Sequence, residues 1–211
     1  MKTPTWQKLG LGALALVGGV LLLGAKPARG HGTILGDGVS YTPSMDEWLW
    51  LARACYGEAS SLEGQTAAAW AMVQRFVALR QTAPENWSQK SFSALVRAFS
   101  QPVNPIWSAQ GSCTQDGRGC CGQTTGPCAS DVIAHRAFVQ SRSWTWLQER
   151  EPELYFMILS FSAGVPPRNP IPSMTNFGAG GQTRCDEVTV GGNSFCGEPP
   201  LHGRVDVVPR Q

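Results

Sequence analysis

The chain has 211 residues, of which 42% are hydrophobic and 15% are charged, and its formal net charge is +2. This composition excludes an intrinsically disordered chain, which needs fewer apolar and more charged residues. Lys2 and Lys8 precede an apolar run, and without them the basic residues equal the 15 acidic residues in number. A neutral remainder has no electrostatic basis for contacting phosphates, so nucleic acid is not an expected partner.

The first 25 residues have the pattern of an export segment. The two lysines are followed by Leu9–Ala25, an uncharged apolar run of 17 residues. As a helix this run would span about 25 Å, near the lower limit for crossing a bilayer. Signal peptides have shorter apolar runs, and Leu23-Gly24-Ala25 is a mediocre cleavage site. We therefore expect residues 1–25 to be an uncleaved membrane anchor or a cleaved signal peptide. Both place the domain outside the cytoplasm: periplasmic, membrane-anchored, secreted or virion-associated.

Helix-start signals follow a glycine-rich segment. Residues 26–43 are rich in glycine and proline and are predicted to be a flexible linker. Ser44-Met-Asp-Glu47 has the spacing of a capping box and opens a predicted helix that ends at Glu58. Ser60-Ser-Leu-Glu63 is read as a second capping box, which opens a helix to about Arg80. On the first helix, Glu58 falls on the edge of the apolar stripe.

Later segments predict more helices and little β-structure. Helices are expected over residues 91–99, 130–140 and 152–163. The last of these has apolar residues on every face, which predicts a central buried helix. Two β-like pieces, Val188–Val190 and Val205–Val208, lie near the C-terminus.

Cysteine usage agrees with export. Six of the seven cysteines lie in glycine-rich loops and are disulfide candidates: Cys113, Cys120, Cys121, Cys128, Cys185 and Cys196. The first four leave a zinc site open as an alternative, but they lack the usual Cys-x2–4-Cys pairs, so we expect no metal and no other cofactor. Cys55 lies in an apolar stripe and is expected to be a buried free thiol. A cysteine protease built on Cys55 and His135 is disfavoured, because a thiol in such a stripe is inert.

The expected fold class is mainly α. We predict a small helical domain over residues 44–180 with disulfide-bonded loops, and a disulfide-bearing extension with a short β-like part over residues 181–211. A hydrophobic helix at the N-terminus precedes both.

One set of motifs resembles a known family. The motifs are Tyr56-Gly57-Glu58-Ala59, Glu63-Gly64-Gln65, the alanines of residues 67–71 and Gln74-Arg75. Together they resemble the core of the SleB-type cell-wall hydrolases. Weaker likenesses follow at residues 92–102, at Trp107 and at residues 172–177, so the resemblance covers about residues 46–180. It implies a lysozyme-like fold and cleavage of peptidoglycan glycan strands, commonly as a lytic transglycosylase, by one glutamate. In this chain that residue is Glu58.

Three positions depart from the family pattern. The turn after Glu58 is about two residues shorter, Gln74 stands where the family has asparagine, and Asn176 stands where histidine is common. These departures leave an alternative function open. The scaffold could serve a non-catalytic, membrane-anchored structural or wall-binding protein, such as a secretion, conjugation or virion-entry component.

The acidic residues favour a single-acid mechanism. Partial burial of Glu58 would favour the protonated form that a general acid needs. No second carboxylate is an obvious partner: Glu63 is assigned to a capping box, and Asp131, Glu151 and Glu153 to first turns of helices. Glu58 would then protonate the leaving oxygen and afterwards take a proton from the 6-hydroxyl of the sugar, which yields a 1,6-anhydro product.

Four residues are candidates for binding the substrate. Trp107, in a proline-flanked loop, is the candidate for a cleft wall. Tyr56 and Asn176 are candidates for hydrogen bonds to the glycan, and Gln65 for orienting Glu58. The expected partners are peptidoglycan strands and, if the N-terminal segment is uncleaved, a membrane.

Overall fold

The computed structural model describes residues 32–104, 137–179 and 188–210. The helices in these ranges are α2 (Met45–Glu58), α3 (Leu62–Thr82), α4 (Pro84–Trp87), α5 (Phe92–Phe99), η1 (Gln101–Val103), α8 (Trp144–Arg150) and α9 (Pro152–Ser162). The strands are β1 (Gly32–Gly36), β2 (Val39–Tyr41), β3 (Asn176–Ala179), β4 (Val188–Val190), β5 (Asn193–Cys196) and β6 (Asp206–Pro209).

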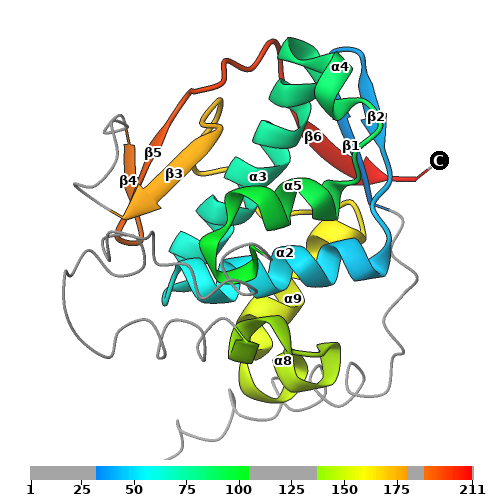
Figure 1. The fold of residues 1–211 in the computed structure, drawn as a ribbon. Helices are drawn as coiled ribbons and strands as arrows, with labels where there is room; N and C mark the ends of the chain where they lie inside the picture. The colour runs from blue at the N-terminus through cyan, green and yellow to red at the C-terminus, as the bar shows by residue number, and fades with distance from the viewer. Residues whose placement is uncertain (1–31, 105–136, 180–187, 211) are drawn as a thin grey trace, which may run out of the picture.

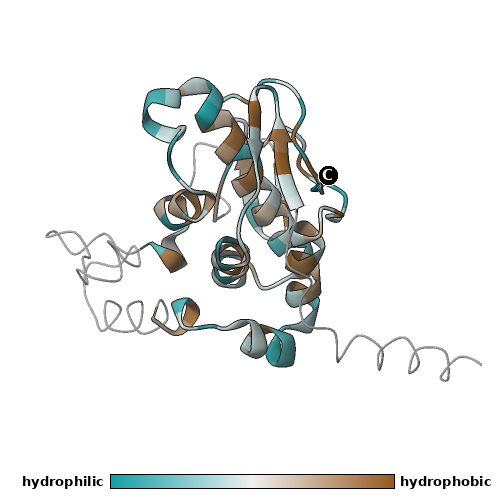
Figure 2. Ribbon diagram, turned by 90° about the vertical axis from the view of Figure 1, so that its right-hand side faces the viewer, coloured by the Kyte–Doolittle hydropathy of each residue, from teal (hydrophilic) through white to brown (hydrophobic). Residues whose placement is uncertain are grey.

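Two three-stranded antiparallel sheets flank the helices. One has the order β2-β1-β6 and the other the order β3-β5-β4. Figure 1 shows them on opposite sides of α3, with α2 and α5 crossing in front of that helix. In Figure 2 the hydrophilic colour lies mostly at the margin of the molecule. The hydrophobic colour lies mostly on segments that face one another. The core therefore lies where the helices meet, between the two sheets.

The N-terminus of α2 confirms the first predicted capping box. Ser44 Oγ accepts a hydrogen bond from the Glu47 N–H at 3.3 Å, and Glu47 Oε2 accepts one from the Ser44 N–H at 2.9 Å. The predicted apolar stripe is buried, with Trp48, Leu51 and Cys55 fully enclosed. The reciprocal cap satisfies two backbone donors, while burial of the stripe holds the helix against its neighbours.

The second predicted capping box is wrong by one residue. The N-cap of α3 is Ser61, whose Oγ accepts from the Gly64 N–H at 3.2 Å. Glu63 is exposed and takes no part in the cap. Ala59 is in an extended conformation, and the chain uses both Ala59 and Ser60 in the turn, so the N-cap lies one residue later than the spacing suggested. The helix itself begins at Leu62, slightly before the expected start at about Gly64.

Helices α5 and α9 lie where the sequence predicts them. Ser91 caps α5 by accepting from the Ala94 N–H at 3.2 Å. α9 has its proline in the first turn, and Gly164 lies just past its end with φ +77°. One face of α9 is not buried, because Phe156 is 45% exposed. The helix expected over residues 130–140 lies largely outside the described residues.

The predicted fold class, a mainly α, lysozyme-like domain with disulfide-bonded loops and an N-terminal hydrophobic helix, is wrong. The described residues form helices together with two antiparallel sheets, and no disulfide joins two of these residues. None of the helices in the described ranges is long and apolar enough to cross a bilayer. The segment expected to be the hydrophobic helix, residues 1–25, lies outside those ranges.

The predicted linker contains a β-hairpin. Strands β1 and β2 are joined by Asp37 and Gly38, where Gly38 adopts φ +73°. β1 also pairs with β6, so that Ile34 lies opposite Val207, and both side chains are buried. An Asp-Gly pair between apolar residues is a hairpin signal, so this hairpin was predictable from the sequence. The chain from Gly32 and the predicted C-terminal extension are therefore parts of one core.

The cysteine predictions have mixed outcomes. Cys55 is free and buried, as predicted. Five candidates lie outside the described residues: Cys113, Cys120, Cys121, Cys128 and Cys185. Cys196 is disulfide-bonded, and since Cys55 is free its partner also lies outside them.

The sheet β2-β1-β6 docks on the end of α9 through Gly164. A Cβ atom at this position would overlap the backbone of Val208 and Pro209. We expect Gly164→Ala to cost about 1–2 kcal/mol for the left-handed conformation, plus about 1–3 kcal/mol for the overlap. Urea unfolding measures the loss. Gly38→Ala is the matched control, because Gly38 also has positive φ but has no atom near the added Cβ. Equal losses for the two variants would contradict this role for Gly164.

Candidate active site

Glu58 is the last residue of α2, and a buried serine holds its carboxyl group. The side chain is half-buried, and its Oε1 accepts a hydrogen bond from Ser100 Oγ at 2.8 Å. Ser100 itself is fully buried and caps the C-terminus of α5. A bond from a buried donor restricts the carboxyl group to one position.

Gly57 explains how Ser100 comes so close. A Cβ atom at Gly57 would overlap the ring of Pro102 and would lie 3.5 Å from Val139. The missing side chain therefore lets η1 pack directly on the last turn of α2. Since Ser100 immediately precedes η1, this packing brings its hydroxyl to Glu58.

Two amide side chains hold the turn that follows Glu58. Gln65 Nε2 donates to the Ala59 carbonyl at 3.1 Å, and Asn193 Nδ2 donates to the Glu58 carbonyl at 3.2 Å. Gly64 and Gly191 are in close backbone contact, because a Cβ on either residue would meet the backbone of the other. The turn is thus fixed between the start of α3 and the hairpin of β4 and β5.

A groove of about 360 Å³ lies beside the Glu58 carboxyl group. It is lined by Tyr56, Gly57, Glu58, Ala59, Ser60, Gln65 and Glu151. The structure therefore brings three of the predicted site residues, Tyr56, Glu58 and Gln65, to one place. Gln65 is only 6% exposed, so it supports the turn and is not free helix surface.

Glu151 is a second carboxylate in this groove, and the sequence reading missed it as a partner for Glu58. It joins α8 to α9 as the N-cap residue of α9, yet its side chain makes no capping hydrogen bond. The sequence assigned it to a helix first turn, where the macrodipole stabilises acidic residues. A glutamate directly before the proline that opens a helix is the only local signal that could have pointed to it.

Tyr56 belongs to an aromatic cluster beside the groove. Its ring centroid lies 5.3 Å from that of Trp146 and 6.3 Å from that of Phe138. The guanidinium of Arg142 stacks on both of these partners, at 4.5 Å from the Trp146 centroid and 3.5 Å from the Phe138 centroid. Aromatic faces next to a carboxyl group suit the apolar faces of sugar rings.

Two other predicted residues are not in the groove lining. Asn176 is on β3, where its Oδ1 accepts from Arg75 Nη1 at 2.6 Å. Trp107 lies outside the described residues.

The protease alternative gains no support, whereas the four cysteines of the zinc alternative lie outside the described residues. Complete burial raises the pKa of the Cys55 thiol, and the negative charge of Glu58 raises it further, so Cys55 stays protonated. His135 lies outside the described residues. Within the described ranges, no group of three or more His, Cys, Asp or Glu side chains is arranged to hold a metal ion.

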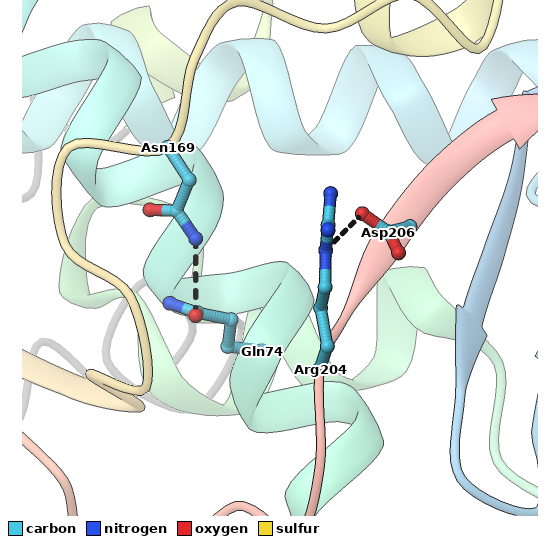
Figure 3. A network of polar contacts seen from close by, with 4 residues as sticks. All are labelled: Gln74, Asn169, Arg204 and Asp206. Atoms are coloured by element: carbon cyan, nitrogen blue, oxygen red, sulfur yellow. Dashed lines mark hydrogen bonds and ion pairs between the residues drawn. The ribbon is translucent and has the colours of Figure 1, made fainter.

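A larger groove, of about 620 Å³, lies on another face of α3 and does not include Glu58. Gln74 is in its wall, about 180° around the helix from Gln65. Gln74 Oε1 accepts from Asn169 Nδ2 and from the Ser173 N–H, and its Nε2 donates to two carbonyl groups of the same loop. Figure 3 shows Asn169 in contact with Gln74 and, beside them, the Arg204–Asp206 ion pair, and all four residues line this groove. Gln74, a departure from the family pattern, thus anchors a loop.

No protein-family model, curated protein or solved structure matches this chain.

Gln65 should contribute to stability through the carbonyl it satisfies. Gln65→Ala removes the donor to the half-buried Ala59 carbonyl, and we expect a loss of about 1–3 kcal/mol in the free energy of unfolding. Thr66→Ala is the matched control, since its hydroxyl donates to the Leu62 carbonyl at an exposed site, and we expect a loss below about 0.5 kcal/mol. Urea denaturation measures both. If the losses are alike, Gln65 does not hold the turn.

Proposed function

We propose that this chain cleaves the glycan strands of bacterial peptidoglycan, with Glu58 as the general acid. The observation that carries the proposal is the half-buried carboxyl group of Glu58, held by Ser100 at 2.8 Å beside a groove. A carboxyl group fixed beside a groove is in position to pass a proton to a glycosidic oxygen that binds there. The motif resemblance to SleB-type hydrolases independently points to the same residue.

The chemistry of a single acid proceeds in two steps. Glu58 donates its proton to the glycosidic oxygen, and the bond between that oxygen and the anomeric carbon breaks. The resulting carboxylate accepts the proton of the sugar 6-hydroxyl, whose oxygen forms the new bond to the anomeric carbon. Atoms and charges balance, water is not consumed, and the enzyme returns to its protonated form.

Glu151 supports a second mechanism for the same substrate. It lines the groove with Glu58 and is not used as a helix cap. A second carboxylate can activate water or act as a nucleophile, and the product then has a reducing end. The two mechanisms therefore differ in the chemical state of the released chain end.

The proposal places the domain outside the cytoplasm, where its substrate lies. It is supported by the two N-terminal lysines and the apolar run that follows them. The expected partner is peptidoglycan, with a membrane in addition if the N-terminal segment is retained.

A zymogram with purified peptidoglycan tests the catalytic role of Glu58. The full-length protein should clear the gel, and Glu58→Gln should lower clearing by at least about 100-fold, because the amide is nearly isosteric but cannot donate the proton. Glu153→Gln is the matched control. Glu153 is an exposed glutamate two residues after Glu151, which lines the groove where α8 joins α9. Equal clearing by Glu58→Gln and the wild type would show that the acid is another residue.

The same samples distinguish the mechanisms. If Glu58 acts alone, mass spectrometry finds 1,6-anhydro ends and Glu151→Gln retains activity. If Glu151 is the second catalytic carboxylate, the released chain ends are reducing. The single variants Glu151→Gln and Glu58→Gln then both lose activity. If the wild type clears no gel, the non-catalytic wall-binding alternative is favoured.

A further inference from the structure

Arg75 of α3 is a half-buried cation that does not line the groove beside Glu58. Its guanidinium lies 3.8 Å from the centroid of the Phe99 ring, which covers one face. Nη1 donates to Asn176 Oδ1 at 2.6 Å and to the Thr175 carbonyl at 3.4 Å. The Nε–H is buried and has no acceptor among the described residues. Arg75 therefore touches α5 and β3 at once and still has unused donors.

No carboxylate balances the charge of Arg75 within the described part of the chain. α5, η1, β3 and β5 contain no acidic residue, and the only one on α3 is Glu63. Glu63 is twelve residues earlier, about 18 Å along the helix. Burial is the only cause that shifts the pKa of Arg75, lowering it to about 10, so the group is still charged at neutral pH.

A partly buried charge is costly to leave unpaired, and no described carboxylate pairs with Arg75, so an anionic ligand would offset this cost. The guanidinium has a planar fork of donors that matches a carboxylate. Nη2 makes no hydrogen bond to a described residue and is not among the fully buried unpaired atoms, so it is the donor that we assign to an incoming anion.

Two structural connections join Arg75 to the turn that carries Glu58. Phe99, on which it stacks, directly precedes Ser100, the donor to Glu58. On the sheet, Asn193 donates to the Glu58 carbonyl, and Cys196, three residues further along β5, lies opposite Asn176. Three residues of strand correspond to about 10 Å. β5 therefore runs from the Glu58 turn to the Arg75 site.

We propose that Arg75 binds a peptide-stem carboxylate of the peptidoglycan strand and so sets the position of the glycan relative to Glu58. This inference rests on the proposed function, and it makes Arg75 a substrate-binding residue that no motif argument assigned. It also predicts that uncharged glycans of the same backbone, such as chitin, bind without the contribution of Arg75.

The test is a binding measurement in the Glu58→Gln background, where turnover does not interfere. Full-length protein in neutral detergent is sedimented with purified sacculi that carry no attached anionic polymers. We expect Arg75→Gln to weaken binding about tenfold, the usual scale for one charge-assisted contact, and amidation of the stem carboxylates to weaken binding of the Arg75 protein by a similar factor. Arg75→Gln should bind amidated sacculi and chitin as well as its parent does.

Arg80→Gln is the matched control. Arg80 is on the same helix and also stacks on aromatic rings, but the charge of Glu47 acts on it. The Arg80→Gln substitution should leave binding to sacculi unchanged. The proposal is overturned if Arg75→Gln binds native sacculi like its parent, or if amidation leaves binding of the Arg75 protein unchanged. The amidation arm needs no variant at Arg75, so misfolding of Arg75→Gln cannot hide the answer. Because cleavage is not measured, this result is independent of the catalytic role of Glu58.

Discussion

The packing of the Pro102 ring on Gly57 is the contact on which the candidate site depends. It is possible because Gly57 has no Cβ, and it brings η1 onto the last turn of α2. Ser100, one residue before η1, then lies within 2.8 Å of the Glu58 carboxyl group. Segments about 40 residues apart in sequence thus meet at one side chain, and the groove beside it forms where the chain leaves α2.

The site combines a fixed carboxyl group with supports of different kinds. Gln65 and Asn193 hold the backbone on either side of the turn, one from a helix and one from a sheet. This arrangement resembles pre-organisation, in which a reactive group is held in place before the substrate arrives. The half-buried, unpaired charge that Arg75 has among the described residues fits the same picture, because functional sites often retain groups that lower stability.

Local signals in the sequence predicted helices α2, α3, α5 and α9 but not the short helices α4 and α8, and they failed where long-range pairing decides. The capping box at Ser44 and the apolar stripe of α2 involve residues within one or two turns, so spacing alone revealed them. The pairing of Ile34 with Val207 joins distant segments and left no periodic trace in a short strand. Glu151 entered the groove through the packing of α8 and α9, which no local pattern records. Sequence reasoning therefore predicted Glu58 as the acid and located strands β4 and β6, but it predicted neither the pairing of strands into two sheets nor Glu151 in the groove.

The central claim is that the position of the Glu58 carboxyl group, and not only its chemistry, makes it the proton donor. Glu58→Asp tests this most directly, because it keeps the carboxyl group and withdraws it by one methylene from Ser100 and from the groove. The turnover rate on soluble peptidoglycan fragments should fall by about 100-fold, since a displacement of about 1 Å has that effect on positioned groups. A rate within a fewfold of the wild type would contradict the account.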